Sequence, residues 1–178
     1  RPANTRKQRS VDAVLGAAKH LFIVQGYQST TVEQIAQTCD LTKGAVYFHC
    51  KDKAALLIAL LDRIEEQVYD PLLRESLTGN EPPPRKLLNY LHKVSAVGGE
   101  DIESVVLPVV ISVEFKSHDS DPEIAERISR LYDKIRAALN TIISQGRRSG
   151  DFITEVRAAE QVAAVLAMHD GVAIEWMR

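Results

Sequence analysis

Apolar residues recur every three to four positions along almost the whole chain, which is the spacing of α-helices with one buried face. The first such stripe ends before Gly26, a residue suited to the left-handed stop of a helix. It consists of Val11, Val14, Leu15, Ala18 and Phe22. Short polar turns separate each stripe from the next, so the pattern predicts an all-α fold.

The stretch 31–53 contains two short helical patterns on either side of a tight turn at 39–41. Thr31 and Gln34 form a capping box in which each side chain satisfies the other's backbone N–H. Thr42 is placed to cap the second helix. The apolar face of the first helix is Val32, Ile35, Ala36 and Cys39. Two short helices across such a turn are typical of a helix-turn-helix unit, whose second helix enters the DNA major groove.

The second of these helices carries small and polar side chains that suit DNA contact. Lys43 lies in its first turn, where recognition residues meet base edges. Gly44 and Ala45 are small enough to let the backbone come close to DNA. Further along, groups that bind phosphates are offered by Tyr47, His49, Lys51 and Lys53. From the spacing of the apolar residues alone, a helical hairpin with a purely structural role and a hydrated, charged edge is an equal alternative to a DNA-binding unit.

A longer helix follows, capped by Asp52 and carrying the stripe Leu57, Leu60, Leu61, Ile64 and Val68. The stripe is long for a domain of three small helices. We therefore expect this fourth helix to leave the N-terminal part and join it to the rest as the only continuous link. Pro71 is expected to end or kink it, and residues 79–84 (GNEPPP) form a loop.

Four more helical patterns fill the remainder of the chain, with a turn at 118–120. Their approximate ranges are 87–99, 102–113, 122–146 and 156–177. The β-branched run 102–113 is also compatible with a strand, but a helix is favoured because no second strand is present to pair with it. Pro108 is expected to bend this helix or mark its start.

The runs TVEQIA and LTKGAVYFH, with KDKAALL behind them, resemble the DNA-binding domain of TetR/AcrR-type transcriptional regulators. The resemblance covers about residues 8–65 and implies an all-α fold. By position it implies DNA contact by Thr31, Thr42, Lys43, Gly44, Ala45, Tyr47, His49 and Lys53. Cys50 departs from the pattern, since the family usually has a larger apolar residue there, and the departure concerns packing rather than DNA contact.

The resemblance also implies what the rest of the chain does. Residues 1–54 are expected to be the DNA-binding domain, and 55–178 a helical effector-binding and dimerisation domain. Family members usually carry one more helix after the last one here, so part of the dimer interface is expected to be absent. The implied action is repression from a palindromic operator as a homodimer, with release by an unknown small molecule. Activation is the alternative, and the operator, regulated genes and effector are not encoded in any recognisable motif.

Charge supports this division. The first 54 residues carry eight Lys or Arg and four Asp or Glu, a net +4, which leaves −6 for the remainder of a chain whose net charge is −2. A basic head on an acidic body is suited to phosphate contact at one end. The first nine residues, RPANTRKQR, are either a disordered tail or an arm that touches DNA.

Composition limits the class of protein. The chain is 45% hydrophobic and 26% charged, as in ordinary globular proteins. Cys39 and Cys50 do not make a disulfide framework; they suit small core positions, with redox sensing as the alternative. No apolar run reaches about 18 residues and no signal peptide is recognisable, so we expect a cytoplasmic protein with no membrane association.

Two other classes of function were weighed. An enzyme would draw on the body's scattered groups, which are His92, His118, His169, Glu114, Asp119, Asp121 and Asp170. These lack the spacing of known catalytic or metal motifs, so we expect no catalytic residue, metal or cofactor. A purely structural protein would explain the helices but not the basic head.

Aromatic and polar residues of the body are candidates for an effector pocket. The candidates are Tyr90, Glu114, Phe115, Tyr132, His169 and Trp176. Plain core packing is the alternative for each of them. Because few basic residues lie on the apolar faces, an apolar or cationic effector is favoured.

Overall fold

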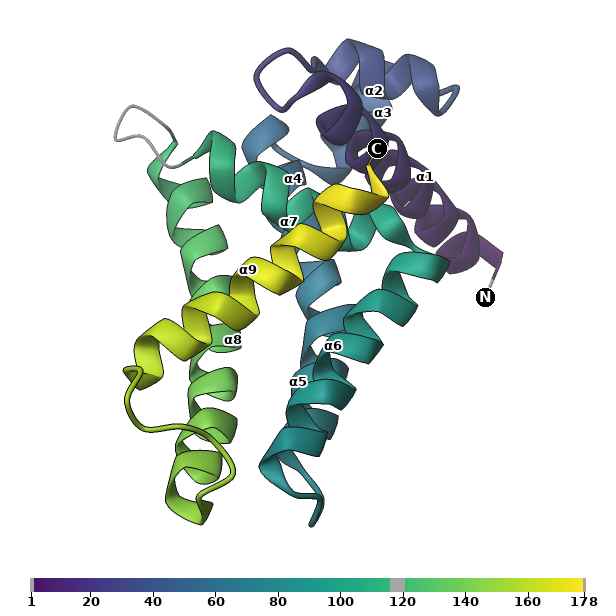
Figure 1. Cartoon of the computed structure of the whole chain (residues 1–178). Coiled ribbons are helices and arrows are strands. Elements are labelled where there is room, and N and C mark those ends of the chain that lie inside the picture. Colours follow the sequence, from purple (N-terminus) through teal and green to yellow (C-terminus); the bar gives the residue numbers. More distant parts are fainter. Residues whose placement is uncertain (1, 116–120, 178) are drawn as a thin grey trace.

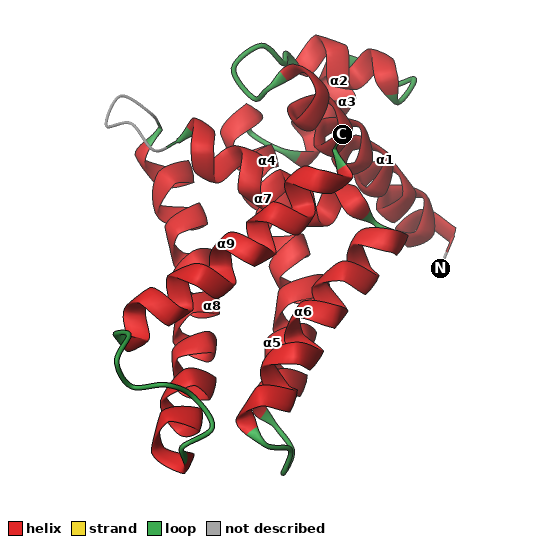
Figure 2. Cartoon of the chain, viewed as in Figure 1, coloured by secondary structure: helices red, strands yellow, loops and turns green. Residues whose placement is uncertain are grey.

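The computed structural model describes residues 2–115 and 121–177, and in these ranges the chain is helical apart from turns and loops, with no strand (Figure 2). The predicted all-α fold is confirmed. The side chains of residues 2–7 and of Trp176 lie outside what is described, as do the residues of the turn predicted at 118–120.

The N-terminal part, the head, consists of α1 (Pro2–Gln25), α2 (Val32–Thr38) and α3 (Lys43–His49). Its helices pack around side chains such as Phe22, Ile35 and Val46, which are almost fully buried. The polar run at the N-terminus is part of α1, so its interpretation as a disordered tail was wrong for the backbone from Pro2 onward. The reason is that no glycine or proline separates residues 3–9 from the apolar stripe of α1, so nothing in the sequence interrupts the helix there.

A continuous rod of three segments connects the head to the body: α4 (Lys53–Ile64), the π-helical turn η1 (Glu65–Tyr69) and α5 (Asp70–Leu77). The Asp70 N–H donates to the Glu65 carbonyl, five residues back, which is π-helical bonding. We expected Pro71 to end or kink this helix, but the rod continues past it. Pro71 occupies the first turn of α5, where a missing N–H is tolerated.

The π turn also shifts which residues face the interior. Buried positions on the rod advance from Leu60 and Leu61 to Ile64, and then by five residues to Tyr69. Two cations of the long helix α8 (Pro122–Ser149) pair with acidic residues at the turn. Arg127 donates to Asp62 and Glu65, at 2.6 Å in both cases, and Lys134 pairs with Glu65 and Asp70. A π turn commonly marks a functional position in a helix.

The body contains α6 (Pro83–Glu100), α7 (Ile102–Glu114), α8 (Pro122–Ser149) and α9 (Ala158–Trp176). Helix α9 crosses the front of the body diagonally (Figure 1) and packs on α6, α7 and α8. The β-branched run is helical, as favoured, with Pro108 inside the helix rather than at its start. One continuous hydrophobic core runs from α1 to α9.

Helix α8 is longer than expected, because Gly146 does not end it. The helix continues to Ser149, and Gly150 is the left-handed stop, with φ of 80°. Gly146 has another role: a Cβ there would lie 2.2 Å from the Phe152 ring. A glycine is therefore required by the loop that folds back onto α8.

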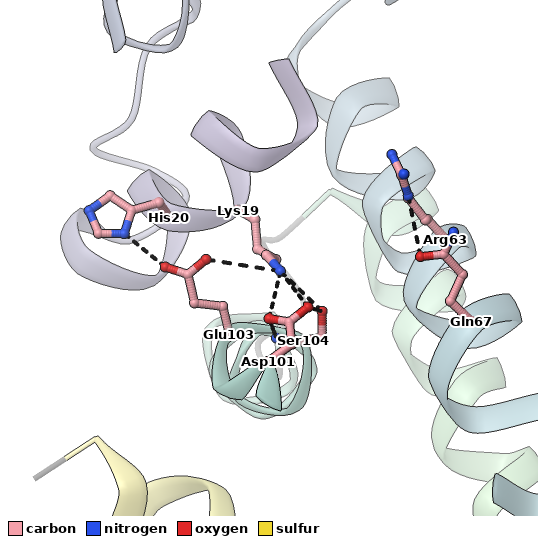
Figure 3. A network of polar contacts seen from close by, with 7 residues as sticks. All are labelled: Lys19, His20, Arg63, Gln67, Asp101, Glu103 and Ser104. Carbon is pink, nitrogen blue, oxygen red and sulfur yellow. Dashed lines mark hydrogen bonds and ion pairs between the residues drawn. The ribbon is translucent and has the colours of Figure 1, made fainter. Parts of the chain in front are cut away.

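The sequence suggested that the rod is the only connection between head and body. In the structure, α7 is a second connection. Helix α7 is fastened to α1 at its N-terminal end, where Lys19 Nζ donates to Asp101 (2.8 Å) and Ser104 (3.1 Å), and His20 pairs with Glu103 (Figure 3). At the other end of α7, Glu114 accepts bonds from the backbone N–H groups of residues 27 and 28. Long-range polar contacts of this kind leave no periodic signal in the sequence.

Candidate nucleic-acid interface and interior cavity

The helix-turn-helix unit is held by the caps that its sequence predicts. The Gln34 N–H donates to Thr31 Oγ1 (3.3 Å), and the Thr31 N–H donates to Gln34 Oε1 (2.8 Å). Thr42 Oγ1 accepts the Ala45 N–H at 3.2 Å. At the turn, Asp40 has a φ of 54°, a region that aspartate tolerates better than most residues. These local bonds fix the start of α3 and the direction of its exposed face.

The exposed face of α3 brings together most of the residues that the resemblance implied. Lys43, Gly44 and Tyr47 are exposed, and Phe48 beside them is 75% exposed. Lys43 pairs with Glu33 of α2 and lies 5.8 Å from the Tyr47 ring centroid. The hydrogen bond to Glu33 raises the pKa of Lys43. The ammonium of Lys43 is therefore charged, and its side chain is 49% exposed on the outer face of α3.

Gly44 is not required by packing within the chain. A Cβ at this position would meet only Thr42 Oγ1, at 4.0 Å. Glycine in a helix costs about 1 kcal/mol relative to alanine. The missing side chain therefore leaves room on the outer surface, where an external surface can approach the backbone.

The other predicted contact residues have partners inside the head. Thr31 is exposed, but it is committed to its cap. Ala45 is half-buried. His49 Nε2 lies 3.1 Å from Ser10 Oγ and so ties the end of α3 to α1. These residues lie beside the exposed face of α3 and orient it.

Lys53 differs most from the sequence-based expectation. Its ammonium donates to three backbone carbonyls, those of Tyr27 (2.7 Å), Thr30 (2.9 Å) and Gln28 (3.3 Å), and lies 4.2 Å from the Tyr27 ring centroid. Burial lowers the pKa of Lys53, and Glu114 opposes this effect. The geometry fastens the rod to the loop after α1 and leaves the ammonium little freedom to bind phosphate.

We expect Lys53→Met to lower the free energy of unfolding by about 1–3 kcal/mol, because three carbonyls lose a donor. Urea denaturation measures this change. The salt dependence of DNA binding should keep its slope, since a residue that binds no phosphate releases no counterion. A slope reduced by about one would instead identify Lys53 as a phosphate contact.

A cavity of about 250 Å³ that is half open to solvent lies between α7, α8 and α9. Phe115, Ala125 and Ile128 supply apolar wall, and Ser112, Ser129, Tyr132, Arg136 and Asp170 supply polar groups. The Tyr132 hydroxyl donates to Asp170 at 3.1 Å. Burial, with the nearby Asp170 charge, raises the pKa of Tyr132, so the phenol stays protonated. Two of the predicted pocket residues, Phe115 and Tyr132, thus share one cavity.

His169 and Tyr90 lie deeper, in a separate aromatic cluster with Tyr69 of the π turn. His169 is 1% exposed. Its Nδ1 lies 2.5 Å from the Tyr90 hydroxyl, and its Nε2 lies 3.4 Å from the Tyr69 hydroxyl. Burial lowers the pKa of His169 to about 4, so the ring is neutral at pH 7. Tyr69 was missed in the sequence, because Val68 continues the stripe of the rod at the ordinary helical spacing and the π turn then buries Tyr69 instead.

Glu114, another predicted pocket residue, does not line the cavity. Its carboxylate accepts hydrogen bonds from the backbone N–H groups of residues 27 and 28 in the head. The Trp176 side chain, together with His118 and Asp119, lies outside the described residues. In the part of the chain that is described, no group of three or more His, Cys, Asp or Glu is arranged to hold a metal ion. Nor does any described helix combine the length and apolar character of a membrane span.

Comparisons with known proteins agree with this geometry. Residues 14–60 match the family described as "Bacterial regulatory proteins, tetR family". The transcriptional regulator QacR of Staphylococcus aureus is 28% identical over 86% of this chain and 79% of its own length. The transcriptional repressor BepR of Brucella suis is 22% identical over 93% and 79%. Among solved structures, the MbdR regulator of Azoarcus sp. CIB has a TM-score of 0.86 and 31% identity, covering 95% of this chain and 87% of that one.

Proposed function

Because this chain belongs to the tetR family of bacterial regulatory proteins, and so is a transcriptional regulator, we propose that it represses transcription as a homodimer on a palindromic operator. In this proposal a small molecule that binds the body releases the protein from DNA. The observation that carries the proposal is the exposed face of α3, with Lys43, Gly44 and Tyr47 presented outward by capped helices.

The outer face of α9 supports the homodimer. Ala163, Ala164, Ala167 and Gly171 are exposed, and Met168 between them is 57% exposed. The opposite face of the same helix is buried on the body. An apolar face of small residues allows a second helix to approach closely, and a two-fold dimer would present two heads to two half-sites.

The cavity beside Phe115 and Tyr132 supports a small-molecule effector. Its volume of about 250 Å³ exceeds the roughly 150 Å³ of an apolar cavity that admits benzene. Its lining combines apolar and polar side chains, which suits a ligand that has both apolar and polar parts. The cavity borders α7, which is fastened to α1, so a ligand there can bias the position of the head.

Lys43→Ala tests the DNA-binding face. We expect it to weaken operator binding by about 1–3 kcal/mol and to relax base preference at one position per half-site. Glu33→Gln is the matched counterpart: it releases Lys43 and removes a negative charge, so affinity should rise. Tyr47→Phe should weaken all sequences about equally, since phosphate contact carries no base information. Binding of randomised operators measures all three, and unchanged preference in Lys43→Ala would refute the assignment of α3.

Reciprocal coupling tests the effector. If a ligand weakens DNA binding by some factor, DNA must weaken ligand binding by the same factor. Titration of free and operator-bound protein with compounds handled by neighbouring gene products measures both. Ala125→Leu should reduce ligand affinity because it narrows the cavity, whereas Ala96→Leu, on the exposed side of α6, should not. A ligand that binds both forms equally yet releases DNA is incompatible with this mechanism.

A further inference from the structure

A second cavity, which we call the joint cavity, lies where head, rod and body meet. It has a volume of about 230 Å³ and is lined by α1, α4, the π turn and the start of α7. It shares no lining residue with the effector cavity. Figure 3 shows part of its polar wall, with Lys19, Asp101 and Ser104 on one side and Arg63 and Gln67 on the other.

The joint cavity is lined by two ion pairs, each of which joins different helices. Arg63 Nη1 of α4 lies 2.6 Å from Asp12 Oδ1 of α1. Lys19 Nζ of α1 lies 2.8 Å from Asp101 Oδ1 at the start of α7. The lining therefore holds two positive and two negative groups, and its formal charge is zero. Its remaining wall includes apolar side chains such as Leu60 and Ile64.

Gly16 is part of the wall and keeps the cavity open. It lies in the middle of α1, where glycine costs about 1 kcal/mol relative to alanine. A Cβ there would meet no atom within 4 Å. Packing does not demand this glycine, and its absence of a side chain leaves space in the joint cavity.

We propose that the joint cavity binds a small zwitterion of amino-acid size that carries an ammonium, a carboxylate and an apolar side chain. A ligand with only one charge would meet an attractive and a repulsive group in each of the two ion pairs, so its interactions with the lining would largely cancel. A zwitterion can place its carboxylate near Arg63 and Lys19 and its ammonium near Asp12 and Asp101, so every charge keeps a partner. The apolar side chain would contact Leu60 and Ile64.

The position of the joint cavity gives such a ligand a consequence for DNA binding. Asp12, Gly16 and Lys19 belong to the head, whereas Asp101 and Ser104 belong to the body. A ligand bound to both sides restrains α1 relative to α7. It would therefore change operator affinity by the ratio of its affinities for the DNA-bound and free forms.

Isothermal titration calorimetry with L-leucine, L-valine, L-methionine and L-phenylalanine tests the proposal on the whole chain without DNA. We expect at least one to bind, with at least a tenfold loss for its two matched analogues, the amine without the carboxylate and the acid without the ammonium. Gly16→Leu should abolish binding by filling the cavity. Gly99→Leu is the control, because Gly99 is also exposed, helical and without a neighbour within 4 Å.

Arg63→Gln keeps the proposal testable if Gly16→Leu does not fold, and it should weaken amino-acid binding at least tenfold. The proposal is overturned if none of the four amino acids binds at 10-fold excess over millimolar protein, if the singly charged analogues bind as well, or if Gly16→Leu or Arg63→Gln binds as the wild type does. Operator binding by the unliganded wild type is measured separately, so failure of this site is distinguishable from failure of the proposed DNA-binding function.

Discussion

Replacing Ala163 and Ala167 by glutamate is expected to give monomers that bind operator DNA on the order of 10²–10⁴ times more weakly than the wild type. Both alanines lie on the exposed face of α9, where we place the centre of the dimer. In a two-fold interface the same patch of both chains takes part, so the two substitutions would bring four carboxylates together and remove them from water. A monomer contacts only one half-site. It also loses the high effective concentration of the second head that a dimer has once its first head is bound to the operator.

Sedimentation velocity and operator titration measure the two parts of this prediction on the same samples. Ala96→Glu on α6 is the control, since it places a glutamate at an exposed helical alanine away from α9, with one added charge per chain instead of two. The control should remain dimeric and bind as the wild type does. A double variant that stays dimeric, or a wild-type monomer that binds a palindromic operator tightly, would show that this face is not the interface.

The elements of the head could be predicted because their signals are local. Thr31 with Gln34, Thr42 and Asp52 cap their helices through bonds that span three residues. Such bonds are visible in the order of side chains, and so is the apolar stripe between them. The same locality applies to α9, whose buried residues Val162, Leu166, His169 and Ala173 follow one another at helical spacing.

Features that depend on contacts between distant segments could not be predicted. The sequence presents Lys53 as one more cation beside the recognition helix. Only the folded chain brings its ammonium to the carbonyls of Tyr27 and Thr30, 26 and 23 residues away. The fastening of α7 to α1 joins Lys19 to Asp101, 82 residues apart. Neither contact leaves a period or a motif, so Lys53 was predicted as a phosphate contact and the pairing of Lys19 with Asp101 was not predicted.

The π turn was not predicted. In the sequence the apolar stripe continues from Ile64 to Val68 at an ordinary four-residue step, and Pro71 suggested the end of a helix. In the structure the buried position after Ile64 is Tyr69 instead, and Val68 is only half-buried. This shift matters for the candidate site because it turns Tyr69 toward His169. His169 and Tyr90 were identified from their residue type, whereas Tyr69 required the register of the rod.

The burial of His169 predicts a specific loss of stability in acid. Its pKa is lowered from 6.5 to about 4 by burial between Tyr69 and Tyr90, with Asp170 next in the chain. Above pH 6.5 both the folded and the unfolded chain hold a neutral ring. Between pH 6.5 and 4 the unfolded chain binds a proton that the folded chain does not, so stability falls as the pH falls, and the effect levels off below pH 4. The full shift corresponds to about 3 kcal/mol.

Urea unfolding of the wild type and of His169→Asn between pH 7.5 and 4 isolates this contribution. Asparagine keeps a donor and an acceptor near the two tyrosine hydroxyls but does not titrate. The wild type should therefore be more stable than the variant at pH 7, and its advantage should shrink by up to about 3 kcal/mol towards pH 4. Carboxylates titrate in both proteins and cancel in the difference. Parallel stability curves for the two proteins across this window would mean that His169 is protonated in the fold as readily as in the unfolded chain, and that the aromatic cluster opens to water.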